Sequence, residues 1–218
     1  MKNVIFLFFF QSATILFAQK LEPAVYAQLN TFRHTGFEGN NFQDFEVGIS
    51  LFSTFWISPK IGFKHALGNP TVQTSFSQNY QQQIQTHYSG NLLSLSTKIR
   101  LTKPEDVWLF IWPQYNLGTV KFNSSYYKTE NNPNQLIFKE RISAKENHSW
   151  LDLAAGIEFY FDTNDRFLTS VYLIYTLMDI RSGFEALSFE STNLRIPSKI
   201  NSTIGLGISI EYCFCKKE

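Results

Sequence analysis

The feature that most constrains the fold of this chain is a two-residue alternation between large apolar side chains and small polar ones. It is clearest in residues 200–214, where Leu206 and Ile208 lie on one face and Gly205 and Gly207 on the other. A period of two over this length is typical of a β-strand whose faces meet different surroundings. Seven segments show such alternation, and an eighth, 167–179, is apolar on both faces with Ser170, Tyr172 and Thr176 on its more polar side. All eight are predicted to be strands. They are 25–30, 44–51, 61–67, 93–101, 109–117, 151–159, 167–179 and 200–214.

The lengths of the segments and of their links narrow the fold further. Most segments are about ten residues long, as in tilted membrane-spanning strands of about 9–11 residues, whereas strands of soluble proteins are usually about 5–6. Three short links are rich in Pro, Asp and Asn, and they are 57–60, 102–106 and 162–166. The long polar links are 33–41, 69–90, 123–148 and 180–199. Strict alternation of short and long links is typical of transmembrane barrels, which have short periplasmic turns and long extracellular loops.

The identity of the polar residues indicates which face points outward. A secreted lipid-binding barrel of the lipocalin kind is the alternative, with apolar residues inside and water outside. Only 17% of the residues are charged, against about 25% in an average soluble domain. The polar face instead carries small residues such as Gly48, Ser50, Ser94 and Ser96, which suit the crowded interior of an eight-stranded barrel. The sequence therefore predicts an all-β fold, an eight-stranded antiparallel up-and-down transmembrane β-barrel.

The first residues resemble an export signal. Residues 1–19 contain one Lys, an apolar stretch and a small-residue end, which predicts a secretory signal peptide cleaved after Ala18 or Gln19. The alternative, a membrane-anchor helix, is too short and is interrupted by polar residues. We expect residues 20–218 to form one barrel domain with both termini in the periplasm. With 19 basic and 18 acidic residues, the chain has a formal net charge of only +1, too little to attract a nucleic acid.

The pattern as a whole, and one motif at its end, resemble a known class. The chain is similar to the small outer-membrane β-barrel proteins of Gram-negative bacteria, the OmpA/OmpX-like barrels and the PorT-like barrels common in Bacteroidetes. The motif resembles the C-terminal signal read by the barrel-assembly machinery, and its residues are Ile208, Ile210, Tyr212 and Phe214. In that class the aromatic residue usually ends the chain, whereas here residues 215–218 follow. The resemblance implies insertion into the outer membrane by that machinery, and it implies no activity.

Strand parity sends seven charged side chains to the predicted interior. They are Glu46, Lys64, Lys98, Arg100, Asp152, Glu158 and Glu211. Counting from the short turns puts Glu46 and Asp152 near the outer mouth and the other five in the periplasmic half. Unpaired charges in a narrow lumen are costly, so we predict that acids and bases pair there and fill the lumen. The alternative is a narrow passive pore for protons or small ions.

The sequence offers little support for catalysis. An outer-leaflet enzyme would need a constellation such as His148, Ser149 and Asp152, but adjacent residues on a strand point to opposite faces. The four His show no metal-ligand spacing. We therefore predict no enzyme activity, no metal and no cofactor. Cys213 and Cys215 are expected to be terminal residues without a function or occasional intermolecular cross-linkers, the alternative being a strained redox pair.

Aromatic belts and loops complete the expectations. Phe32, Phe122 and Trp150 are predicted to form the outer aromatic belt, and Pro113 to sit at a bulge because it lacks an N–H. Residues 135–142 are expected either to extend strands beyond the membrane as an exposed hairpin edge or to fold back on the barrel. The sequence thus predicts a non-catalytic barrel that contacts outer-membrane lipid and, through its extracellular loops, a protein or glycan partner of the envelope or surface.

Overall fold

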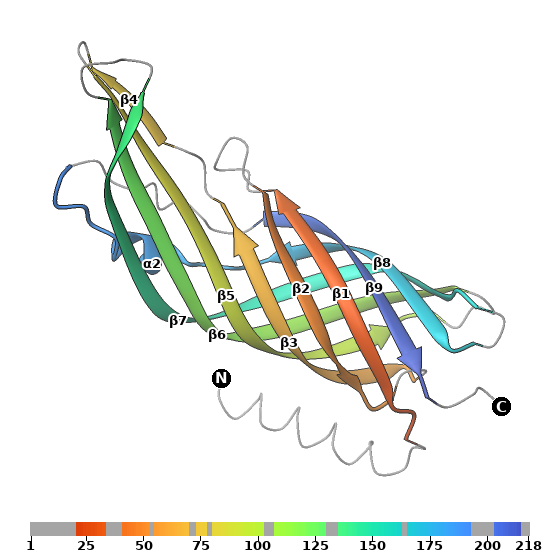
Figure 1. Ribbon diagram of the computed structural model, residues 1–218. Coiled ribbons are helices and arrows are strands. Elements are labelled where there is room, and N and C mark those ends of the chain that lie inside the picture. Colours follow the sequence, from red (N-terminus) through yellow and green to blue (C-terminus); the bar gives the residue numbers. More distant parts are fainter. Residues whose placement is uncertain are drawn as a thin grey trace.

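The computed structural model describes residues 21–33, 41–52, 55–69, 73–77, 80–102, 107–129, 135–162, 165–192 and 203–214. In these ranges the chain forms one antiparallel sheet and one short helix (Figure 1). The predicted signal peptide, residues 1–19, lies outside the described residues, as do His34 and Cys215. No helix in the described part of the chain is long and apolar enough to cross a membrane.

The strands close into a ring. Their bounds are β1 Ala24–Arg33, β2 Asn41–Ser50, β3 Ile57–Gly68, β4 Gln73–Ser77, β5 Tyr80–Arg100, β6 Val107–Thr129, β7 Leu136–Tyr160, β8 Phe167–Thr176 and β9 Thr203–Cys213, with helix α2 at Arg181–Glu185. Each strand pairs with the next along the chain, except that β3 pairs with β5, while β4 adds to β5 alone and β9 returns to β1. The predicted eight-stranded up-and-down barrel is confirmed.

The outside of the ring is apolar around its circumference. On β3, β8 and β9, for example, Phe63, Leu173 and Leu206 are 55%, 59% and 64% exposed. On β6 the outward apolar positions run from Val107 to Leu117, which matches the about 9–11 residues that a tilted strand needs to cross a bilayer. Large apolar side chains outside and polar ones inside make this a transmembrane barrel.

Three strands continue far past this apolar band. Residues 80–92 of β5, 118–129 of β6 and 136–150 of β7, together with β4, form a region that we call the projecting sheet (Figure 1). The twelve residues of β6 beyond Leu117 extend the strand by about 40 Å at about 3.3 Å per residue. We call the end of the barrel that carries this sheet the upper end. The sequence prediction of loops at 69–90 and 123–148 is wrong for most of these residues. The expectation that residues 135–142 extend strands beyond the membrane as a hairpin is confirmed, because Leu136 pairs with Thr129 and Ile142 with Ser124.

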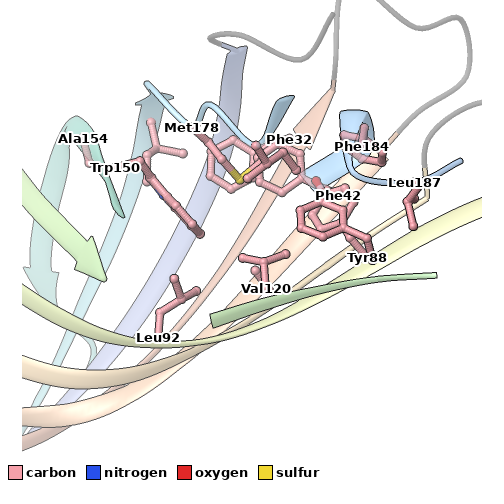
Figure 2. Close-up of a cluster of buried hydrophobic side chains, with 14 of the residues drawn as sticks. Phe32, Phe42, Tyr88, Leu92, Val120, Trp150, Ala154, Met178, Phe184 and Leu187 are labelled. Atoms are coloured by element: carbon pink, nitrogen blue, oxygen red, sulfur yellow. The ribbon is translucent and has the colours of Figure 1, made fainter. Parts of the chain in front are cut away.

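The segment 177–192, which includes α2, lies against the inner face of the projecting sheet. Together they bury an apolar core, part of which Figure 2 shows. Its members are Tyr88, Val120, Phe122, Tyr126, Met178, Ile180, Phe184, Leu187 and Phe189. The ring of Phe184 lies 4.9 Å from that of Phe122, and the ring of Phe189 lies 5.8 Å from that of Tyr126. The projecting sheet therefore has a packed apolar core, which continues into the barrel below.

Several local predictions are wrong. Residues 57–60, predicted as a turn, are the first residues of β3. Pro113 causes no register shift, and its pairing with β7 is continuous, but the pairing of β6 with β5 is interrupted at Trp112 and Pro113. The described shift lies instead between Tyr126 and Tyr127. The predicted outer belt residues Phe32, Phe122 and Trp150 are buried inside, at 1%, 0% and 6% exposure. At this height the apolar residues face inward, because strands beyond the bilayer meet water on their outer side.

Candidate functional site

The upper half of the lumen holds a charged cluster centred on Lys64. Its Nζ lies 2.9 Å from Asp152 Oδ2, 3.6 Å from Glu46 Oε2 and 3.8 Å from Asp44 Oδ2. All four side chains are at most 3% exposed, and we call them the upper charged layer. Neutral side chains add hydrogen bonds to these carboxylates, since Gln28, Asn30 and Asn116 donate to Glu46, Asp44 and Asp152 at 2.6–2.8 Å. Three buried carboxylates thus share one buried ammonium.

Below this cluster lies a layer of large rings, which we call the aromatic layer. It consists of Tyr26, Phe110, Trp112 and Tyr172, with ring centroids 5.7–6.4 Å apart. Glycines make room for these rings: a Cβ on Gly207 would lie 2.1 Å from Tyr172 Cε2. The hydroxyls reach upward, because Tyr26 donates to Glu46 at 2.5 Å and Tyr172 to Asn30 at 2.8 Å. The rings therefore fill the cross-section of the lumen and anchor the layer above.

A second set of charges occupies the lower half of the lumen. Lys98 donates to Glu158, which also accepts from Arg100 Nε at 2.6 Å, and Lys60 donates to Glu211. We call these five residues the lower charged layer. Both ammonium groups also face the aromatic layer, since Lys98 Nζ lies 4.8 Å and Lys60 Nζ 5.4 Å from the centroid of the Trp112 ring. Each of the five is at most 4% exposed.

The structure places all seven sequence-predicted lumen residues inside the barrel, in two groups. Glu46, Asp152 and Lys64 form the upper group, so the expected lower position of Lys64 is wrong. Lys98, Arg100, Glu158 and Glu211 lie in the lower group. The upper group is set by register, because Lys64 is the cross-strand partner of Glu46.

Sequence reasoning missed two members of these layers. Asp44 has the parity of Glu46, and Lys60 has the parity of Lys64. The signal for both was therefore present in the sequence. Lys60 was not predicted as a lumen residue because the preceding Pro59 indicated a turn. The structure places both residues within β3.

The upper mouth of the lumen is closed by apolar side chains. Phe32 and Phe42 stack with centroids 4.1 Å apart, and Tyr88 fills the space over Gly68, where a Cβ would lie 2.2 Å from its ring. Trp150 and Met178 join the same cluster (Figure 2). A solute that entered from this end would meet this cap before it reached either charged layer.

The described residues do not assemble the catalytic constellation considered above. His148 faces the inside of the projecting sheet, with its Nε2 3.6 Å from Glu146 Oε2, whereas Ser149 is exposed on the opposite face. Asp152 lies in the lumen and contacts Lys64. No group of three or more His, Cys, Asp or Glu in the described ranges is arranged to hold a metal ion. Cys213 is buried at the lower end of β9.

The residues of the predicted assembly signal lie at the end of β9, the last strand of the ring. Ile208, Ile210 and Phe214 point outward with exposures of 45%, 49% and 56%. The ring of Tyr212 lies 5.1 Å from Phe167 and 5.4 Å from Phe214. These aromatic residues form a cluster at the lower rim, where β9 meets β8.

A closed ring with an apolar exterior and an ion-paired interior defines this chain as a transmembrane barrel with a filled lumen. No family model matches the chain, and no curated protein matches its sequence. Among solved structures, it is similar to Neisserial surface protein A, with 7% identity, a TM-score of 0.42, and coverage of 89% of this chain and 97% of that one. The outer membrane protein Ail of Yersinia pestis shows 10% identity, a TM-score of 0.37 and coverage of 88% and 96%. Values this low extend no activity of either protein to this chain.

Proposed function

We propose that this chain is a non-catalytic integral barrel of a Gram-negative outer membrane, and that its projecting sheet contacts a protein or glycan partner of the envelope or surface. The observation that carries this proposal is the projecting sheet itself. It stands on the barrel and is held by an apolar core. Its outer face is polar near the barrel, and its far end exposes Phe76, Ile137 and Phe138. A packed platform of this kind suits recognition, because binding to it does not require ordering a flexible loop.

The orientation and the export route are parts of the same proposal. Residues 1–19 are the signal peptide, both termini lie in the periplasm, and the projecting sheet is extracellular. The lower-rim residues Ile208, Ile210, Tyr212 and Phe214 are the signal for the barrel-assembly machinery. The pairing of Ala24 with Cys213 supports a common side for both termini, because it puts the start of β1 and the end of β9 at the lower end.

The membrane placement is tested with the purified chain that lacks residues 1–19. We expect it to fold only in detergent micelles or lipid, because its outward apolar side chains cannot face water. Heat modifiability on gels and circular dichroism measure the folded fraction. A folded monomer in buffer without detergent would overturn the proposal.

The partner contact is tested by shortening the hairpin of β6 and β7. Asn123 and Ser143 are cross-strand partners, so Asn-Gly in place of residues 124–142 joins them with a tight turn and preserves the register. Whole-cell pull-down with this variant should lose the surface or envelope partner that the full chain retains. Equal recovery of the same partner by a variant that folds like the full chain would place the contact elsewhere.

A further inference from the structure

The outer face of the projecting sheet carries positive charge without negative charge. Lys121 on β6 and Lys145 and Arg141 on β7 are exposed and alternate with inward-facing neighbours. The described residues of the projecting sheet contain two carboxylates: Glu140, which accepts hydrogen bonds from the 177–192 segment, and Glu146. Glu146 faces inward, where its Oε2 accepts a hydrogen bond from Ser182 Oγ at 2.7 Å. The strand parity therefore separates the charges, with cations turned to the outside.

Two of these cations oppose each other directly. Lys121 and Lys145 are cross-strand partners, and like charges in that arrangement destabilise a sheet. In the described part of the chain neither lysine forms an ion pair with a carboxylate. An anion supplied from outside the chain would lie between the two ammonium groups and remove this repulsion.

The height of the lysine pair indicates where such an anion comes from. Leu117 is the last apolar outward residue of β6, and Lys121 lies four residues above it. At about 3.3 Å per residue and a tilt of about 40°, the pair stands about 10 Å above the apolar band. Lysine side chains extend toward the membrane surface. This places the ammonium groups at the level of lipid headgroups, whose layer adds about 5–8 Å to each side of the hydrocarbon core.

The residues around the pair fit a sugar-containing headgroup. A shallow groove on this face is lined by Ser89, Asn91, Thr119 and the two lysines. Thr119 donates to Asn147 Oδ1 at 2.9 Å, directly below the pair. Hydroxyl and amide groups hydrogen-bond sugar hydroxyls, and the apolar band below, which begins at Leu117, contacts acyl chains.

We propose that the Lys121–Lys145 face of the projecting sheet binds the phosphate groups of a glycolipid in the outer leaflet. The lysines contact the phosphates, the polar groove contacts the sugar, and the apolar band contacts the acyl chains. This inference rests on the proposed placement of the barrel in the outer membrane. It assigns a lipid partner to one face of the projecting sheet and leaves the tip of the β6–β7 hairpin for other contacts.

The test compares two glycolipids that differ only in phosphate. The full-length mature barrel in phosphatidylcholine nanodiscs is titrated with bisphosphorylated lipid A or with the same lipid after removal of both phosphates. Native mass spectrometry measures bound lipid. We expect the phosphorylated form to bind about tenfold or more tightly, and Lys121→Gln with Lys145→Gln to lose this preference, since each cation near anionic lipid contributes about 1 kcal/mol, and 1.4 kcal/mol corresponds to tenfold.

Matched variants show whether charge on this face is responsible. Lys121→Arg with Lys145→Arg keeps the charge and should keep the preference, and Arg166→Gln at the lower end should leave it unchanged. Equal binding of both lipids by the wild type, or an unchanged preference in the double Gln variant, would overturn the inference.

A soluble-anion arm tests the source of the phosphate. Inorganic phosphate or a sulfated oligosaccharide that binds as tightly as the lipid would also overturn the inference, because the ligand would then be a free anion. If the barrel inserts into nanodiscs but binds the phosphorylated and dephosphorylated lipids equally, only this inference fails. If the chain folds without detergent, the proposed function fails as well.

Discussion

Lys64 is the residue on which the upper charged layer depends. Its ammonium lies within 3.8 Å of three buried carboxylates, and it also donates to Gln114 Oε1 at 3.2 Å. The cost of this arrangement is the dehydration of four charges. The attraction that offsets this cost comes from the Lys64 ammonium alone, so loss of Lys64 should destabilise the upper charged layer.

Lys64→Met tests this dependence. The variant keeps the volume but leaves three carboxylates without a cation, so we expect the free energy of unfolding at pH 7 to fall by about 3–5 kcal/mol. Urea titration of the barrel in detergent measures the change. Lys145→Met, an exposed lysine on β7, is the control and should change stability by less than about 0.5 kcal/mol. Similar effects of the two substitutions would contradict the central role of Lys64.

The lower charged layer gives a second test at the residue scale. Arg100 donates to Glu158 at 2.6 Å, while Glu211 takes Lys60 as its partner. Arg100→Ala should therefore lower the free energy of unfolding by about 3 kcal/mol or more, because the buried pair of Arg100 and Glu158 loses one partner. The variant should unfold at a lower urea concentration. Heat modifiability should shift to lower temperature in the same variant. An unchanged shift would show that Lys98 alone neutralises Glu158.

At the scale of elements, the 177–192 segment is held to the projecting sheet by packing and by one carboxylate. The Glu140 carboxylate accepts hydrogen bonds from the Ser191 hydroxyl and from the backbone N–H groups of Glu190 and Ser191, the latter two at 3.2 and 3.1 Å. The hydrogen bond from the Ser191 hydroxyl, followed by those from the two N–H groups, lowers the pKa of Glu140 below its ordinary value of 4.5. The charged form is therefore the one that binds the segment.

The attachment should consequently weaken in acid. A lowered pKa in the folded state means that the stabilisation is complete above pH 4.5 and is lost as the pH falls through the lowered pKa. Hydrogen exchange at residues 187–192 should be slow at pH 7 and faster, after correction for intrinsic rates, at pH 3. Glu140→Gln should show the faster exchange already at pH 7. Equal protection in the variant and the wild type at pH 7 would exclude this role of the carboxylate.

Gly183 tests the packing of helix α2. A Cβ at this position would lie 2.1 Å from Phe122 Cε2, so Gly183→Val should displace α2 from the sheet while the barrel stays folded. Limited proteolysis within residues 177–192 measures the displacement, and heat modifiability measures the barrel. Glu185→Val, on the exposed side of α2, is the control and should remain protected. Resistance of the Gly183→Val variant to protease would show that Phe122 moves instead.

The elements that the sequence predicted well are those inside the membrane. There the rule is uniform, apolar outward and small or paired polar inward, and eight segments follow it. Beyond Leu117 the rule inverts: Val120 and Phe122 face inward while Thr119 and Lys121 face outward. The period of two continues, but the outward residues are now polar. These residues therefore do not show the apolar outward face that identified the other strands, and they were predicted as loops. The position of the 177–192 segment could not be predicted. It packs on the inner face of the projecting sheet, and most of that sheet was predicted as loops.

At the scale of the whole molecule, the lumen is closed by successive layers. An ion that enters from the upper end meets the Phe32–Phe42 cap, then the upper charged layer, the aromatic layer and the lower charged layer. Each layer draws side chains from several strands, so the motion of one side chain leaves the other layers in place. Passage would require an ion to lose its hydration shell among the rings of the aromatic layer.

The barrel should therefore show no stable single-channel current in planar bilayers, and this should hold when the upper cap is disturbed. Gly183→Val displaces the segment that covers the upper end but leaves the two charged layers and the aromatic layer in place. If the lumen itself is the barrier, the variant stays closed, like the wild type. If the 177–192 segment is a gate over an otherwise open lumen, the variant conducts while the wild type does not. Stable currents in the wild type would contradict the filled lumen itself. Ions would then have crossed the upper charged layer, the aromatic layer and the lower charged layer.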